Sequence, residues 1–254
     1  MKISLSTGSH IEIPFSLRKN FQMAKELNFD GVEFVINDEY VFHKVNFIKK
    51  LSKDYNIPIL SIHCPIITMP FLWPIKYWVN KTFKIAHELE GKLVVIHPPF
   101  MKPYYSKIGL GLLEYLKEKR REYPDIKITL ENFRYSRKNK FDNYEKFNKV
   151  LEQFNFDLTL DTTHIGFTDY ELSYVYNLFK SRIKNIHISD WKTNHEHLTP
   201  GTGILPLKEL IEDIKKDNYQ GFLTLELLFL PWINNRKVFQ ETKNSINFIK
   251  KYYG

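Results

Sequence analysis

Short apolar runs alternate with longer amphipathic stretches along the whole chain. The apolar runs are rich in Val, Ile and Leu on both faces, which is typical of parallel strands covered by helices. The stretches between them repeat apolar side chains at helical spacing, as Leu17, Phe21 and Ala24 do. We therefore expect strands over residues 3–6, 32–36, 59–63, 93–97, 126–131, 158–161, 183–188 and 222–227, and helices over residues 16–27, 40–55, 75–90, 107–123, 143–154, 169–180, 207–217 and 234–252.

This alternation of strand and helix predicts an α/β protein that folds as a single (β/α)8 TIM barrel. The expected strands recur about every 30 residues, as the βα units of such a barrel do. One barrel takes about 250 residues, and the chain has 254. We therefore expect residues 1–254 to form one domain.

Cysteine usage and the start of the chain indicate a cytoplasmic protein. The lone Cys64 cannot form an internal disulfide, which fits a reducing compartment. The first ten residues alternate polar and apolar side chains and lack the long apolar run of a secretory signal. Residues 57–75 are almost wholly apolar, but four prolines and His63 interrupt them, so we expect no membrane span there.

The formal net charge of +8 adds a basic surface to this picture. Basic surfaces attract phosphate backbones, so a nucleic-acid partner is one interpretation. The lysines recur on the expected outer helices, however, and a chain rich in Lys, Ile, Glu and Tyr is typical of cytosolic enzymes from hyperthermophiles. We therefore interpret the charge as a solvated exterior.

Six of the expected strands end on side chains that can bind a metal ion: His63, His97, Glu131, Asp161, His187 and Glu226. In a (β/α)8 barrel the carboxyl ends of the strands meet at one mouth, where the chemistry takes place. The last four of these residues end neighbouring strands, and together they form an oxygen-rich set suited to Mn²⁺, Mg²⁺, Co²⁺ or Zn²⁺ with an open coordination position. A single strand-end carboxylate is usually bound by loop amides, but four such ends in register predict a catalytic metal.

Further histidines and a basic segment lie near this expected mouth. His164 and His197 would join His63 and His97 there, either completing a multi-metal cluster or orienting one metal and a polar substrate. The basic segment after Glu131 is a candidate site for a sugar phosphate or DNA, with an ordinary solvated loop as the alternative. Its cations are Arg134, Arg137, Lys138 and Lys140.

The motifs around these residues resemble those of one family, the xylose isomerase-like TIM barrels. That family includes sugar isomerases and epimerases, inosose isomerase-type enzymes and endonuclease IV. The stretch KELNFDGVEF, which contains Glu33, resembles the family's signature from the first helix into the second strand. The other similar motifs, in chain order, are TLEN at Glu131, LDTTHIG at Asp161, HISD at His187, HLTPGTG at His197 and GFLTLEL at Glu226.

For the isomerases and epimerases, the resemblance implies that Glu131, Asp161, His187 and Glu226 bind one catalytic metal. It also implies that Glu131 and Glu226 face opposite sides of a bound ketose or polyol and exchange protons with carbon. A metal that polarises carbonyl and hydroxyl oxygens as a Lewis acid makes this proton transfer easier, so no organic cofactor is expected.

Endonuclease IV gives the rival interpretation, a zinc-dependent phosphodiesterase acting at apurinic/apyrimidinic sites. The chain departs from it at the ninth zinc ligand, where His195 stands in place of an Asp. It also departs after the second strand, where the acidic segment 37–39 would repel phosphates. The nuclease's other zinc ligands match His63, His97, Glu131, Asp161, His164, His187, His197 and Glu226.

Two more departures bear on the choice of function. After His63, the apolar stretch CPIITMPFLWP replaces the nuclease's aromatic DNA-contacting pattern and is typical of a lid or a subunit contact. Pairing of two subunits through residues 66–78 would make a homodimer, which is one alternative. Epimerases of free sugars usually carry an Arg soon after the His that matches His187, and residues 188–190 lack it. We favour a metal-dependent isomerase or epimerase of a small sugar, polyol or sugar phosphate, with the endonuclease and a noncatalytic metal-binding barrel as alternatives.

Overall fold

The strands and helices are those of a barrel. The computed structural model describes residues 1–10, 16–36, 44–65, 75–99, 102–134, 143–193, 195–229 and 233–254. Its strands are β1 (Lys2–Ser6), β2 (Gly31–Val35), β3 (Ile59–His63), β4 (Leu93–Ile96), β5 (Lys127–Glu131), β6 (Asp157–Asp161), β7 (Ile183–Ile188), β8 (Asp190–Lys192), β9 (His195–Leu198) and β10 (Phe222–Leu225). Its helices are η1 (Thr7–His10), α1 (Ser16–Glu26), α3 (Val45–Tyr55), α4 (Ile75–Glu88), α5 (Lys107–Glu122), α6 (Tyr144–Phe154), α7 (Thr162–Gly166), α8 (Leu172–Phe179), α9 (Leu207–Lys216) and α10 (Asn235–Tyr253).

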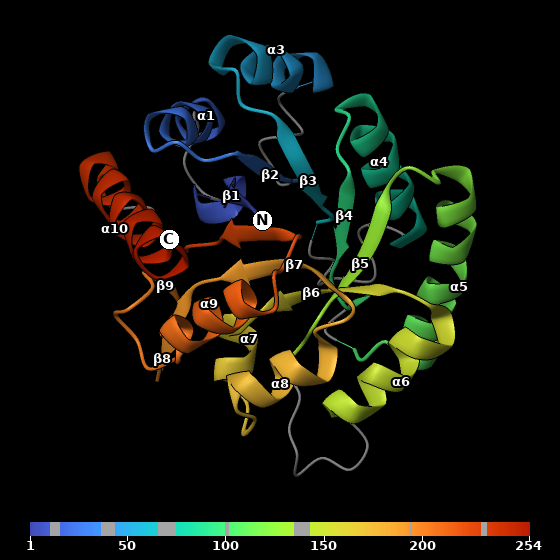
Figure 1. Ribbon diagram of the computed structural model, residues 1–254. Helices are drawn as coiled ribbons and strands as arrows, with labels where there is room; N and C mark the ends of the chain where they lie inside the picture. The colour runs from blue at the N-terminus through green and yellow to red at the C-terminus, as the bar shows by residue number, and fades with distance from the viewer. Residues whose placement is uncertain are drawn as a thin grey trace.

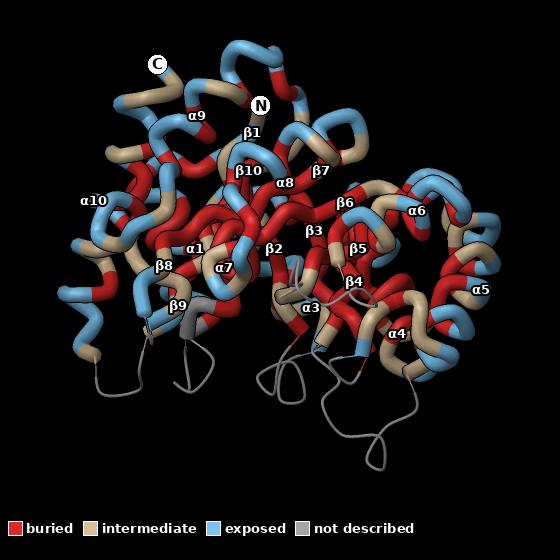
Figure 2. Tube along the Cα trace, turned by 90° about the horizontal axis from the view of Figure 1, so that it is seen from below, coloured by how far each residue is buried: buried red, intermediate tan, exposed pale blue. Residues whose placement is uncertain are grey.

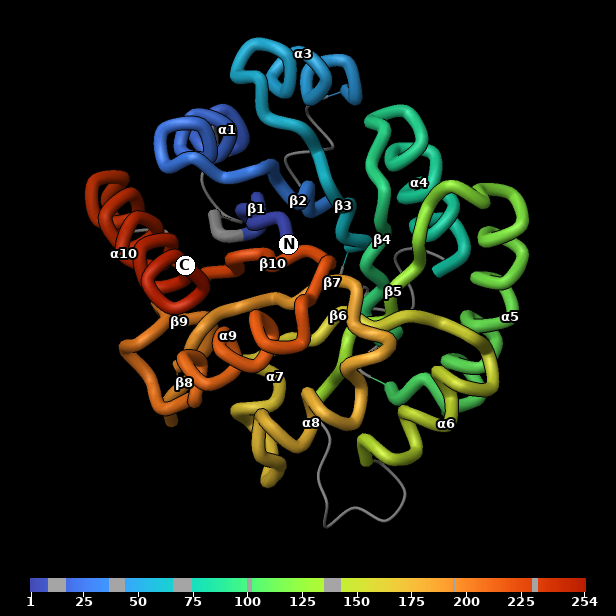
Figure 3. The backbone as a smooth tube through the Cα atoms, viewed as in Figure 1, coloured from blue at the N-terminus to red at the C-terminus, as the bar shows by residue number. Residues whose placement is uncertain are grey.

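Eight parallel strands close into a barrel in the order β1-β10-β7-β6-β5-β4-β3-β2. The long helices surround it, as Figure 1 shows. Closure joins the two ends of the chain, because β1 pairs in parallel with β10, with Lys2 opposite Phe222 (Figure 3). A closed sheet leaves no strand edge unpaired. The (β/α)8 barrel predicted from the sequence is confirmed.

Apolar side chains fill the layer between the strands and the helices. Leu5, Phe21, Ile48 and Leu116 are wholly buried there. Figure 2 shows the buried residues on the strands and on the inner sides of the helices, and the exposed residues on their outer sides. None of the described helices is long and apolar enough to cross a membrane.

The inside of the barrel is polar. A continuous ring of apolar side chains is the usual filling of such barrels, but here wholly buried polar side chains lie on the strands and bond to one another. The Oγ atoms of Thr129 and Thr159, for example, are 2.7 Å apart. The wholly buried polar residues on the barrel strands include Ser4, Glu33, Ser61, Thr129, Thr159, Asn185 and Thr224.

The element boundaries differ from the prediction in a few places. The turn α7 was not expected; it forms because Asp161 caps it, with the side chain accepting a hydrogen bond from the His164 amide at 2.8 Å. The next helix begins at Leu172 instead of Asp169, because the Thr168 hydroxyl holds a turn by bonding to Ile165 O and the Tyr170 amide.

Other boundaries were also misplaced. The predicted helix 40–55 is α3, which begins at Val45, and residues 40–43 lie outside the described part of the chain. Strands β4 and β10 end at Ile96 and Leu225, so His97 and Glu226 each follow their strand by one residue. The hairpin β8–β9 between β7 and α9 was not expected either.

Candidate metal centre at the mouth of the barrel

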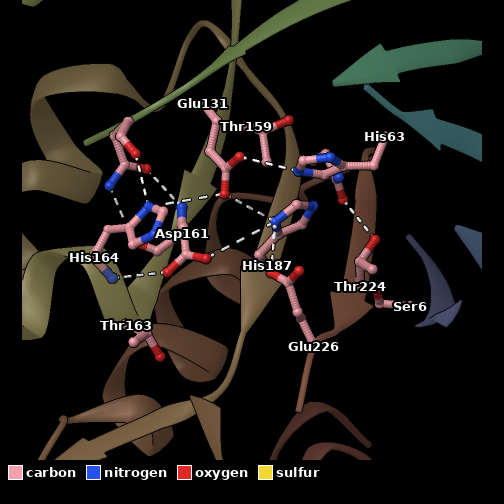
Figure 4. Close-up of polar contacts among 12 residues, drawn as sticks. Ser6, His63, Glu131, Thr159, Asp161, Thr163, His164, His187, Thr224 and Glu226 are labelled. Atoms are coloured by element: carbon pink, nitrogen blue, oxygen red, sulfur yellow. Dashed lines mark hydrogen bonds and ion pairs between the residues drawn. The ribbon is translucent and has the colours of Figure 1, made fainter. Parts of the chain in front are cut away.

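Four predicted ligands converge at the carboxyl ends of neighbouring strands. Glu131 ends β5, Asp161 ends β6, His187 lies in β7 and Glu226 follows β10. One ligand atom from each lies within 4.8 Å of the others. Figure 4 shows these side chains pointing toward one another. The geometry therefore suits a shared cation, as the order of the motifs predicts.

His187 lies at the centre of the group. Its Nδ1 is 3.0 Å from Glu226 Oε2, 3.3 Å from Glu131 Oε1 and 3.9 Å from Asp161 Oδ2. Burial lowers the pKa of His187, but the surrounding carboxylates raise it well above its usual range. Burial has the opposite effect on Glu131 and Glu226, whose pKa values His187 nevertheless holds below their usual range. Without a metal, the positive imidazolium balances these carboxylates.

Asp161 is the candidate ligand whose surroundings most clearly favour a cation. Its Oδ1 accepts the α7 capping hydrogen bond, but its Oδ2 is buried and has no hydrogen-bond partner among the described residues. Burial raises the pKa of Asp161, which means that its charge is poorly balanced. Buried polar atoms nearly always have a partner, so an oxygen left open beside Glu131, His187 and Glu226 fits a cation ligand.

Three further histidines are fixed in the same way, with Nδ1 bonded to the backbone and Nε2 left for other contacts. The Nδ1 atoms of His63, His97 and His164 lie 2.7, 3.2 and 2.9 Å from backbone carbonyl oxygens. A carbonyl only accepts, so each Nδ1 donates its hydrogen and each Nε2 is left for a ligand or a neighbouring side chain. His63 Nε2, for example, is 3.1 Å from Glu131 Oε2. Burial lowers the pKa of His97 to about 4, so its ring is neutral at neutral pH.

Two additional ligand groups arise from these histidines. His63 groups with Glu131 and His187, and Asp161 groups with His164 and His197. His97 belongs to no such group among the described residues, although its ring lies 5.7 Å from that of His164.

His195 is exposed on β9 and likewise joins none of the ligand groups formed by described residues. Residues two apart in a strand usually share a face. The backbone of His197 interrupts this alternation, because its φ is 50°. His197 therefore lies at the mouth beside Asp161 and His164, whereas His195 is exposed and lies outside this group.

The metal-free protein is expected to lose stability as the pH rises, and His63 supplies part of the loss. Burial lowers the pKa of His63, but the hydrogen bond and charge of Glu131 raise it from 6.5 to about 9. The folded state therefore holds this proton more tightly, and the contribution, roughly 3 kcal/mol, is present below about pH 6.5 and lost by about pH 9. Urea unfolding in a chelator at the two pH values measures the change. The His63→Gln variant should show a smaller fall than the wild type, and an equal fall in both would contradict the assignment.

The predicted anion site is described only at Arg134. Its guanidinium lies 3.6 Å from the centre of the Phe167 ring and pairs with Glu196. The charge of Arg134 is thus already matched by a carboxylate. Arg137, Lys138 and Lys140 lie outside the described residues, as do the acidic segment 37–39 and residues 66–74 of the predicted lid or subunit contact.

Asn132 supports the candidate ligands and was not predicted from the sequence. Its side chain accepts from the Asp161 amide at 2.6 Å and donates to the Asp161 carbonyl at 3.1 Å. Its own carbonyl accepts from His164 Nδ1. Asn132 therefore fixes the ends of β5 and β6 relative to each other. The available signal was its place directly after Glu131 in TLEN.

A cavity of about 780 Å³ lies at the opposite end of the barrel. It is lined by residues at the starts of β4, β5, β7 and β10 and at the ends of α8 and α9, and its lysines are Lys92, Lys127, Lys180 and Lys184. It contains none of the converging ligand groups. We therefore place the chemistry at the mouth, where the buried carboxylates and imidazoles meet.

Comparisons with known proteins agree with the fold. A sequence profile of the family described as "Xylose isomerase-like TIM barrel" matches residues 21–252. An uncharacterized protein of Mycobacterium leprae is 25% identical over an alignment of length 254 that covers 89% of this chain and 89% of that protein.

Two similar solved structures have different activities in their names. A D-psicose 3-epimerase from Clostridium cellulolyticum, solved with D-tagatose, is 17% identical with a TM-score of 0.74, covering 100% of this chain and 99% of the other. An AP endonuclease, family 2, from Brucella melitensis is 15% identical with a TM-score of 0.72, covering 99% and 98%. At these identities the likeness establishes a shared fold only. The reaction has to be inferred from the residues of the candidate site.

Proposed function

Because the chain belongs to the xylose isomerase-like TIM barrel family, we propose that it is a divalent-metal-dependent isomerase or epimerase of a small sugar, polyol or sugar phosphate. The observation that carries the proposal is the convergence of Glu131, Asp161, His187 and Glu226 within 4.8 Å at the mouth. The epimerase activity named for one structural neighbour is consistent with it.

The donor set fits a divalent metal. Three carboxylates and one imidazole would hold it, and Asp161 Oδ2 has no other partner among the described residues. When bound, a metal of this kind supplies Lewis acidity that polarises a substrate carbonyl and acidifies the neighbouring C–H. The side chains around it must then bind the substrate and move the proton.

Glu226 is the better placed of the two expected proton carriers. Its side chain is 19% exposed, and the contacts found for it among the described residues are made by Oε2. Glu131 is 3% exposed, and its two oxygens face His187 and His63. Glu226 Oε1 is therefore open toward the mouth, while Glu131 must give up a histidine contact before it can exchange a proton. We assign the proton transfer to both, with Glu226 as the group nearer to solvent.

Metal content and solvent exchange test the proposal together. We expect one tightly held divalent ion per chain, and deuterium incorporation beside the carbonyl of at least one member of a panel of ketoses and ketose phosphates in D₂O. The control is protein stripped with a chelator and reloaded with Mn²⁺, Co²⁺ or Zn²⁺. Tight metal binding without exchange in any panel member would contradict the proposal and favour the noncatalytic barrel.

A zinc-dependent phosphodiesterase acting at abasic sites is the second candidate. The specific observation in its favour is the pair of additional ligand groups, His63–Glu131–His187 and Asp161–His164–His197. Several metals close together can share a hydroxide nucleophile and hold phosphate oxygens. Three zinc ions per chain, together with cleavage of a duplex containing one abasic site but not of its intact counterpart, would replace the isomerase proposal by this one.

A further inference from the structure

Glu33 is a buried carboxylate beneath the candidate metal centre. It lies in β2, and both Glu33 and His187 are wholly buried. Glu33 Oε1 is 3.0 Å from His187 Nε2. In the described part of the chain neither of these two atoms has a hydrogen-bond partner, because the contact has the distance but not the alignment of a hydrogen bond. This carboxylate has no part in the proton transfer proposed above.

A chain of hydrogen bonds fixes the orientation of Glu33. Thr224 donates to Asn185 Oδ1 at 2.8 Å, which commits the amide nitrogen of Asn185 to donate to Glu33 Oε2 at 3.1 Å. Ser61 donates to the same oxygen at 2.8 Å, and Ser4 contacts Thr224 at 2.7 Å. Every neighbour of Oε2 is thus a donor, as an acceptor-only carboxylate requires. Oε1 is left facing His187.

The surroundings of His187 decide which of its nitrogens can bind a metal. Four carboxylates surround the ring. Nδ1 faces oxygens of Glu131, Asp161 and Glu226, and Nε2 faces an oxygen of Glu33. A histidine nitrogen that binds a metal carries no hydrogen, so the hydrogen of the neutral ring must be on the other nitrogen. With the metal on Nδ1, the hydrogen lies on Nε2, which is 3.0 Å from Glu33 Oε1.

We propose that Glu33 is a positioning residue that holds His187 with Nδ1 toward the metal and Nε2–H toward the Glu33 carboxylate. A carboxylate behind a metal-bound histidine fixes the ring orientation and increases the electron density that the ring donates. The other mouth histidines with a fixed Nδ1 hydrogen, His63, His97 and His164, use backbone carbonyls instead. A carboxylate is a stronger hydrogen-bond acceptor than a carbonyl. Of these four histidines, His187 should therefore donate the most electron density to a metal. The proposal rests on the metal site of the proposed function but not on its substrate or reaction.

The Glu33→Gln variant tests this role through metal binding alone. Gln keeps the size of the side chain but removes the negative charge behind His187. Competition with a chromophoric chelator should show Co²⁺ and Zn²⁺ bound about 10- to 100-fold more weakly than by the wild type. The visible absorption of the Co²⁺ form should also shift, because His187 donates less strongly. Affinity within about threefold of the wild type and an unchanged spectrum would overturn the proposal.

Thr129→Val is the matched control. Thr129 is a wholly buried residue of the barrel interior, and its hydroxyl bonds to Thr159 and to the Val94 carbonyl, outside the chain of hydrogen bonds that holds Glu33. We expect the metal affinity of Thr129→Val to stay within about threefold of the wild type. A loss as large as that of Glu33→Gln would mean that any change in the polar interior weakens the site, and this would contradict a specific role of Glu33.

A measurement on the wild type covers the case in which Glu33→Gln does not fold. ¹⁵N resonances of the histidine rings in the Zn²⁺ form report which nitrogen carries the metal and which the hydrogen. We expect Nδ1 of His187 to bind Zn²⁺ and Nε2 to be protonated; the reverse would overturn the proposal. None of these readouts uses a substrate. Failure to find an isomerase reaction would therefore not contradict the Glu33 proposal. Failure of the Glu33 tests would in turn not contradict the proposed reaction, which solvent exchange tests separately.

Discussion

Glu226→Gln is expected to lower deuterium incorporation from D₂O into the substrate at least about 100-fold while the protein stays folded. The amide has the shape of the carboxylate but cannot take up the proton from carbon. Glu226 is 19% exposed at the mouth and Gln fills the same space, so we expect the barrel to stay folded, although the contact with His187 loses its charge. The measurement is NMR-detected exchange at saturating metal, with circular dichroism to verify folding.

Metal content separates the two roles of Glu226, because this residue is both a candidate ligand and the proposed proton carrier. Exchange lost with the ion still bound would establish the proton transfer. The matched control is Glu209→Gln, an exposed glutamate on α9, which should keep full activity. Retained exchange in Glu226→Gln would remove Glu226 from the mechanism.

Asp161→Asn is expected to weaken metal binding at least about 100-fold, since loss of a direct ligand should exceed the effect of losing its supporting residue. The same change should leave the metal-free protein no less stable than the wild type. Asn can still accept the α7 capping hydrogen bond from the His164 amide. It also removes a buried negative charge whose Oδ2 has no hydrogen-bond partner.

Asp157 offers the control for Asp161, because it lies at the other end of the same strand. Asp157 begins β6 and is 3.8 Å from Lys184, far from the mouth. Asp157→Asn should bind metal as the wild type does. Equal metal affinity of Asp161→Asn and the wild type, measured by chelator competition, would exclude Asp161 as a ligand.

The barrel and the four converging residues could be predicted because both depend on local patterns. Each strand is apolar on both faces, and parallel strands in a closed barrel bring their carboxyl ends to one rim. Glu131 and Asp161 end neighbouring strands and must therefore lie close to each other. The family predicted from the motifs is also confirmed.

The contacts that hold these candidate ligands in place could not be predicted, because they join strands that are far apart in the sequence. Glu33 and His187 come from β2 and β7, which are not neighbours in the sheet, so their contact exists only through the barrel interior. The left-handed backbone of His197 could not be predicted either, because few non-glycine residues adopt this conformation and the strand pattern does not mark the ones that do. The sequence therefore did not show that His195 and His197, two residues apart, lie in different surroundings.

Pairing between β1 and β10 has a consequence for how the protein is made. The strand that completes the cylinder is also the last one to leave the ribosome, and Glu226 follows it directly. A nascent chain that stops before residue 222 exposes the free sides of β1 and β7, which are prone to join other chains. It also lacks one of the four groups that would hold the ion. The proposed metal site is thus complete only once β10 has been made, and truncated products should accumulate as aggregates without bound ion.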